Sequence, residues 1–124
     1  MKDINDKLTY KGKEYTLVFN LNVLEAIQDE YGTLTAWIEK AYGKGTGEPS
    51  AKALAFAIAE MVNEGIDIAN EEATLDVALE PITPKMANRM LSEYMKKNGI
   101  DKVIAKVDKL MGDSLQGGKN SKNE

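Results

Sequence analysis

The chain contains neither histidine nor cysteine, which removes most of the side chains that proteins use for catalysis and for binding transition metals. Without histidine, the commonest general base and zinc ligand is absent, together with every Ser-His or Cys-His pair. Without cysteine, disulfides, thiolate metal sites and thiol nucleophiles are excluded. Residue chemistry alone therefore does not show what the protein does, and we expect no cofactor or metal.

Three groups of residues resemble ligand sites, and each has a simpler explanation. A phosphate loop needs the order Gly-Lys-Ser/Thr, which is absent from the glycine-rich residues 43–47, and a helix rather than a strand is predicted before them. A calcium loop needs alternating acids and a central glycine, which Asp67 and residues 70–72 lack. Helix capping explains these residues better. Glu25 and Asp29 could form a carboxylate site for acid/base chemistry. Their i, i+4 spacing is explained more simply by a shared solvated helix face.

Charge is distributed unevenly along the chain. Residues 53–84 carry seven acidic and no basic side chains, whereas residues 85–109 carry seven basic and three acidic ones. This polarity suits a charged partner or a homo-oligomer, although two solvated faces explain it as simply. The basic residues lie on two adjacent predicted helices and are Lys85, Arg89, Lys96, Lys97, Lys102, Lys106 and Lys109. Nucleic-acid binding is disfavoured because only one of them is arginine and the sequence pI is about 5.0.

Four of the six methionines fall in the last two predicted helices. Thioether side chains adapt to irregular or changing apolar partners, and they also fill cores. We predict a partner-binding surface on the helix that begins near Pro84, and its residues are Met86, Met90, Leu91, Tyr94 and Met95. The alternative is that these side chains are part of the core.

The elements that must position this surface begin with a β-hairpin over about residues 7–20. β-Branched and aromatic residues at 8–10 and 15–19 flank a short turn at Lys11-Gly12-Lys13. In the second strand, Tyr15, Leu17 and Phe19 share one face, which helices must cover because an isolated hairpin is marginal in water.

Helices are predicted over the rest of the domain, about residues 22–111. Capping and stop signals predict helices over about 22–31, 34–42, 51–62, 70–79, 84–98 and 100–111. The stretch 51–62 is apolar nearly all round, which is typical of a central helix. The prediction is therefore an α+β, mainly α fold with five or six helices around that segment.

One globular domain, residues 1–111, is expected to precede a disordered tail, residues 112–124, which is rich in Gly, Ser, Asn and Lys. The longest apolar run, Ala53–Ala59, is far shorter than the roughly 20 residues of a membrane span. The first six residues lack the apolar core of an export signal. We expect a cytoplasmic protein with no membrane partner.

The opening of the chain resembles a known family. Residues 7–32 read KLTYKGKEYTLVFNLNVLEAIQDEYG, with a Lys-Gly-Lys turn, a strand ending in Phe19-Asn20-Leu21-Asn22 and a helix closing with Glu30-Tyr31-Gly32. This wording is similar to the start of tail assembly chaperones of long-tailed bacteriophages, in members from phages and prophages of Gram-positive bacteria. The order of predicted elements is similar over residues 7–111, and the amino-acid sequence itself is recognisably similar over residues 8–38.

The resemblance implies a non-enzymatic protein that acts in virion morphogenesis, in the cytoplasm of the bacterial host. Chaperones of this family are thought to coat the phage tape-measure protein, keep its apolar helices soluble and help recruit tail-tube subunits. Two alternatives stay open at this point: a structural tail or head-tail connector subunit, and a small nucleic-acid-binding regulator that uses the basic face.

Overall fold

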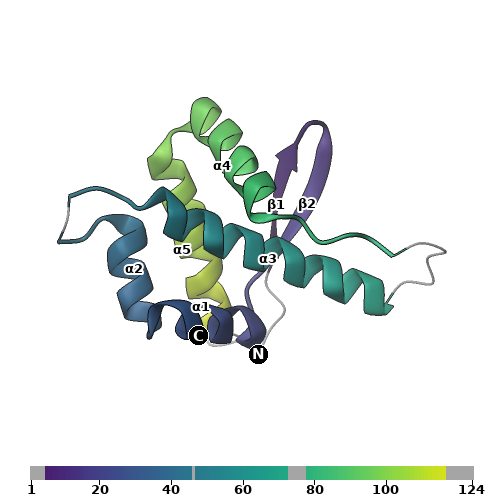
Figure 1. The fold of residues 1–124 in the computed structure, drawn as a ribbon, viewed down its shortest axis with the longest axis horizontal. Helices are drawn as coiled ribbons and strands as arrows, with labels where there is room; N and C mark the ends of the chain where they lie inside the picture. Colours follow the sequence, from purple (N-terminus) through teal and green to yellow (C-terminus); the bar gives the residue numbers. More distant parts are fainter. Residues whose placement is uncertain (1–4, 46, 73–77, 117–124) are drawn as a thin grey trace, which may run out of the picture.

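The computed structural model describes residues 5–45, 47–72 and 78–116, which form an N-terminal β-hairpin followed by five helices (Figure 1). The elements in chain order are β1 (Asn5–Tyr10), β2 (Lys13–Val18), α1 (Leu21–Tyr31), α2 (Leu34–Tyr42), α3 (Ala51–Glu72), α4 (Pro84–Asn98) and α5 (Ile100–Gln116). The predicted α+β, mainly α class is confirmed. Within the described residues, no helix is long and apolar enough to cross a membrane.

The hairpin turns through two residues, Lys11 and Gly12, rather than the three predicted. Both have positive φ, 51° and 75°, which is the geometry of the type I′ turn that matches the twist of two antiparallel strands. Lys13 pairs with Tyr10 and therefore belongs to β2. Leu17 on the inner face is fully buried, so helices cover that face as expected.

Helices α1 and α2 have the predicted ends because their capping residues act locally. The Asn20 side chain accepts hydrogen bonds from the first turn of α1, and Thr33 does the same for α2. Gly32 and Gly43 follow the two helices with positive φ. The indole of Trp37, which is fully buried, donates a 2.9 Å hydrogen bond to the carbonyl of Ala53 and thereby joins α2 to the start of α3.

Helix α3 is longer than predicted, because it does not stop near Val62 or Gly65 and no new helix begins at Asn70. The glycine is needed for packing rather than for a turn: a Cβ at Gly65 would lie 2.6 Å from the backbone oxygen of Thr16 on β2. The predicted helix over residues 70–79 is wrong at both ends, since Asn70 lies inside α3 and Leu79 in an extended segment. Residues 73–77 lie outside the described residues.

The extended segment 78–83, which we call the strap, returns along α3 and is held by two asparagine side chains. The amide of Asn63 accepts a 2.8 Å hydrogen bond from the N–H of Ile82 and donates one of 3.2 Å to its carbonyl. Asn70 makes the same pair of bonds with Leu79, at 2.8 and 3.0 Å. Both asparagines therefore satisfy backbone groups that would otherwise lack partners.

Helix α4 begins as predicted, with Thr83 as the cap and Pro84 at the first position. Helix α5 continues to Gln116, so the predicted domain end at residue 111 is too early. Ser114 is only 1% exposed, which shows that the buried stripe of α5 extends one turn past Met111. The glycine and serine content made this turn resemble a linker. Residues 117–124 of the predicted tail lie outside the described residues.

An ion pair connects α5 to the hairpin. The Nζ atom of Lys106 lies 3.0 Å from a carboxylate oxygen of Asp6. Burial by itself raises the pKa of Asp6, but hydrogen bonds from Lys106 and from the N–H of Lys7 outweigh burial, and the pKa lies below its ordinary value. The charged form of Asp6 is therefore the form that the fold stabilises.

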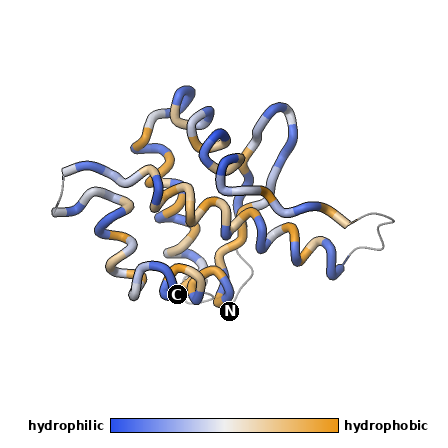
Figure 2. The backbone as a smooth tube through the Cα atoms, in the orientation of Figure 1, coloured by the Kyte–Doolittle hydropathy of each residue, from blue (hydrophilic) through white to orange (hydrophobic). Residues whose placement is uncertain are grey.

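The core is arranged around α3, which packs against α1, α2, α4 and β2. Figure 1 shows α3 crossing the molecule with α4 on one side and α1 and α2 on the other. In Figure 2 the apolar stretches gather on the first half of α3 and on the inner turns around it, whereas the outer turns of α4 are polar. The prediction of a central helix in this region is confirmed.

Candidate partner-binding groove

The five residues predicted as a partner-binding surface do not form one surface. Met90 and Leu91 are 1% and 4% exposed, which places most of both side chains in the core. Met95 is half-buried and lines a groove beside Leu91. Met86 faces the strap and β2, and Tyr94 faces β1, where the ammonium of Lys106 lies over its ring. Only the Leu91 and Met95 part of the prediction lies in the groove that we consider here.

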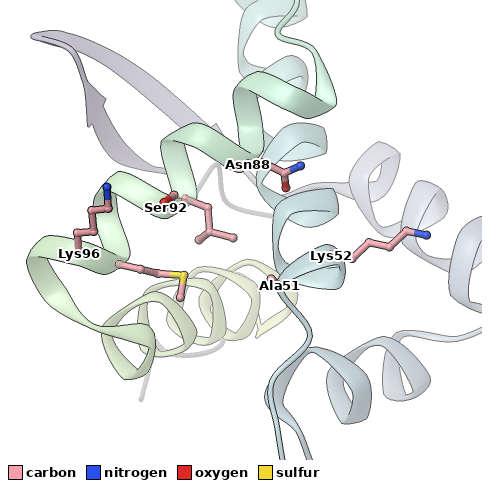
Figure 3. A pocket seen from close by; sticks show the side chains of 7 residues that line it. Ala51, Lys52, Asn88, Ser92 and Lys96 are labelled. Atoms are coloured by element: carbon pink, nitrogen blue, oxygen red, sulfur yellow. The ribbon is translucent and has the colours of Figure 1, made fainter.

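The first half of this groove lies between the start of α3 and the second half of α4 (Figure 3). It has a volume of about 740 Å³, and its lining residues are Ala51, Lys52, Asn88, Leu91, Ser92, Met95 and Lys96. Figure 3 shows Asn88, Ser92 and Lys96 on successive turns of α4, opposite Ala51 and Lys52. The two lysine side chains extend outward, so the floor is apolar and the rim is basic.

The second half lies between α1, α3 and the start of α4, with a volume of about 510 Å³. The rings of Tyr31 and Phe56 form one wall, in an edge-to-face contact with 5.6 Å between their centroids. Ala59 and Ile82 also line this half, and the carboxylates of Glu30 and Glu60 are on it too. The remaining lining residues are Lys52, Ala55, Asn63, Pro84 and Asn88.

Lys52 and Asn88 line both halves, so we treat them as one feature, the α3–α4 groove. On α3 its residues are 52, 55, 56, 59, 60 and 63, which is the spacing of a single helix face. On α4 they are 84, 88, 91, 92, 95 and 96, which is again one face. From residue 51 to residue 63, α3 rises about 18 Å at 1.5 Å per residue. A helical segment of about three turns fits this length.

The charges of the groove have no ionic partners of their own. Within the described part of the chain, none of the ion pairs includes Lys52, Lys96, Glu30 or Glu60. Burial raises the pKa of Glu60, and the nearby carboxylate of Glu64 raises it further. Within the described residues, no cation pairs with the Glu60 carboxylate to offset its lost hydration.

The sequence analysis missed the contribution of α3 to this groove. The available signal was the recurrence of alanine at 51, 55 and 59, four residues apart on a helix that was expected to be covered on all sides. In the structure Ala51 is exposed and Ala59 is half-buried, so this face of α3 has no covering element along part of its length.

The other candidate sites gain no support. Among the described residues, no group of three or more acidic side chains could hold a metal ion. Three of the seven basic residues on α4 and α5, Lys97, Lys106 and Lys109, are engaged in ion pairs with carboxylates.

Comparisons with protein-family models, with characterised proteins and with solved structures find no match to this chain.

Proposed function

We propose that this protein is a non-enzymatic tail assembly chaperone that binds the tape-measure protein of a phage or prophage and helps recruit tail-tube subunits. The observation that carries the proposal is the α3–α4 groove, whose apolar floor is about as long as three helical turns. A long helical partner with apolar stripes needs such a surface to stay soluble.

Two further features support the proposal. The order of elements, a small hairpin followed by a mainly helical body, agrees with the layout that the sequence resemblance implies. The net charge of −4 opposes self-aggregation of a protein that exposes apolar surface.

The test is co-expression with the tape-measure and tail-tube proteins encoded near this gene, followed by pull-down and size-exclusion chromatography. We expect a soluble complex with a tape-measure protein that is insoluble alone. Ser92→Trp, which fills the exposed first half of the groove, should abolish the complex. Arg89→Trp is the matched control, because Arg89 is equally exposed on α4 and does not line the groove.

Other outcomes would support the alternatives. Regular rings or tubes formed by this protein alone would indicate a structural tail or connector subunit. Binding to duplex DNA that weakens steeply as salt rises would indicate a nucleic-acid-binding regulator. Equal loss of the complex in Ser92→Trp and Arg89→Trp would show that the groove is not the binding site.

A further inference from the structure

The two ends of the α3–α4 groove carry opposite charge. Lys96 lies at the end formed by the second half of α4, whereas Lys52, at the start of α3, lines both halves. Glu30 and Glu60 lie at the other end, beside the Tyr31 and Phe56 rings. Within the described residues, none of these four side chains forms an ion pair.

The two ends are far enough apart to act independently. On α4, Lys96 lies eight residues from Asn88, where the acidic half begins, which corresponds to about 12 Å along the helix axis. At physiological salt the Debye length is about 8 Å. A charge bound at one end is therefore largely screened from the other end, and each end selects its own partner.

The acidic end has a particular need for a cation. Glu60 is half-buried and its carboxylate has lost part of its hydration, while Glu64 adds a second negative charge nearby. The aliphatic part of a lysine or arginine side chain can lie over the apolar floor while its charged group reaches the carboxylates. The face of the Phe56 ring would also favour a cation.

We propose that the α3–α4 groove binds an apolar helical segment whose two ends carry opposite charge, with its basic end at Glu30 and Glu60 and its acidic end at Lys96. The inference rests on the proposed function, because it names the chemistry of the segment that the chaperone binds. Charge sets which end of the segment lies where. It does not set chain direction, because an amphipathic helix can be turned end for end with the same face inward.

The experiment uses the full chain and four synthetic helical peptides of about 14 residues with the same leucine stripe. Two are polarised, with lysines at one end and glutamates at the other, in either order along the peptide. The other two carry only lysines or only glutamates. We expect both polarised peptides to bind about 3- to 10-fold more tightly than either uniform peptide, since each exposed pair contributes about 0.2–1 kcal/mol.

The orientation is measured with a nitroxide on the basic end of each polarised peptide. The label should broaden the methyl NMR signal of Ala59 and leave that of Met95 sharp, for both peptide orders. The protein has no cysteine, so labelling chemistry is confined to the peptide. Broadening at Met95 instead, or equal broadening at both methyl groups, would overturn the proposal.

Charge variants test the same point from the side of the protein. The double variant Glu30→Gln and Glu60→Gln should weaken binding of the polarised and all-lysine peptides by at least 3-fold and should not weaken binding of the all-glutamate peptide. Glu71→Gln, on the exposed last turn of α3 and outside the groove, should leave all four affinities unchanged.

The failures of the two proposals are distinguishable. Equal affinity for all four peptides would refute the charge polarity while the groove remains an apolar binding site. Absence of binding to every peptide, together with no complex with the tape-measure protein, would refute the proposed function as well. Concentration-dependent self-association that shifts the Ala59 and Met95 signals without peptide would identify a second copy as the occupant and overturn the proposal.

Discussion

Replacing Gly65 by alanine tests whether the close contact between α3 and β2 is what requires glycine at this position of α3. In an isolated helix the substitution stabilises by about 1 kcal/mol, because glycine has the greater conformational freedom in the unfolded chain. Here the new Cβ would lie 2.6 Å from the Thr16 backbone oxygen. A backbone atom cannot rotate away as a side chain can, so the helix and the strand must separate. Overpacking of this kind costs about 1–3 kcal/mol.

We expect the packing cost of Gly65→Ala to offset or exceed the gain in helix propensity, for a net loss of up to about 2 kcal/mol, or up to roughly 10 °C in Tm. The matched control is Gly112→Ala in α5, where nothing lies within 4 Å of the added Cβ. That variant should gain about 0.5–1 kcal/mol. Thermal and urea unfolding followed by circular dichroism measures both. A rise in Tm for both variants would show that the contact is not what makes glycine necessary.

Three other substitutions test separate contacts. Asn63→Ala removes both hydrogen bonds to the Ile82 backbone and should cost about 1–3 kcal/mol, with faster hydrogen exchange of the Ile82 amide; unchanged exchange would contradict the contact. Trp37→Phe leaves a cavity and removes the indole hydrogen bond to the Ala53 carbonyl, so it should cost about 2–3 kcal/mol in urea unfolding, whereas a loss below about 0.5 kcal/mol would refute its role. Asp6→Asn should lose at most about 1 kcal/mol at pH 7, because the pair with Lys106 is half exposed. Because the pKa of Asp6 is lowered in the folded protein, this stabilisation is present above the ordinary carboxyl pKa and is lost as pH falls through the lowered value. The unfolding curves of the wild-type protein and Asp6→Asn should therefore converge in acid.

Local signals predicted the fold well. Asn20, Gly32, Thr33 and Thr83 act on backbone groups within three or four residues, so their capping roles follow from the neighbouring sequence. The alternating pattern of β2 predicted its buried face for the same reason.

Contacts between distant parts of the chain produced the errors. The sequence predicts a helix end near residue 62, but α3 continues through Gly65, and the reason for this glycine, the backbone of Thr16, lies in another element. Asn70 was read as a cap, although its side chain instead pairs with Leu79 on the strap. In both cases the residue type correctly marks a position with a special structural role, but only the contacts with distant residues show which role it has.

The candidate site was harder to predict than the fold for a related reason. Periodicity identifies the apolar stripe of a helix but not which part of the stripe another element covers. Met90 and Met95 both belong to the predicted apolar stripe, yet the first is buried in the core and the second is partly exposed. The opposite charges of the groove come from three helices, and no single stretch of sequence contains them.

The two asparagines that hold the strap constrain how many residues this segment contains, but not which residues they are. Seven residues of helix between Asn63 and Asn70 rise about 10.5 Å, and three residues of extended chain between Leu79 and Ile82 span about 10 Å. The helix and the strap therefore advance by the same distance between these two asparagine contacts. Each contact uses only main-chain atoms of the strap. Substitutions at Glu80 and Pro81 leave both asparagine contacts intact. Insertion or deletion of one residue between Leu79 and Ile82 moves one of the two contacts out of register. Sequence drift in this segment should thus be frequent among functional variants, and changes in its length rare.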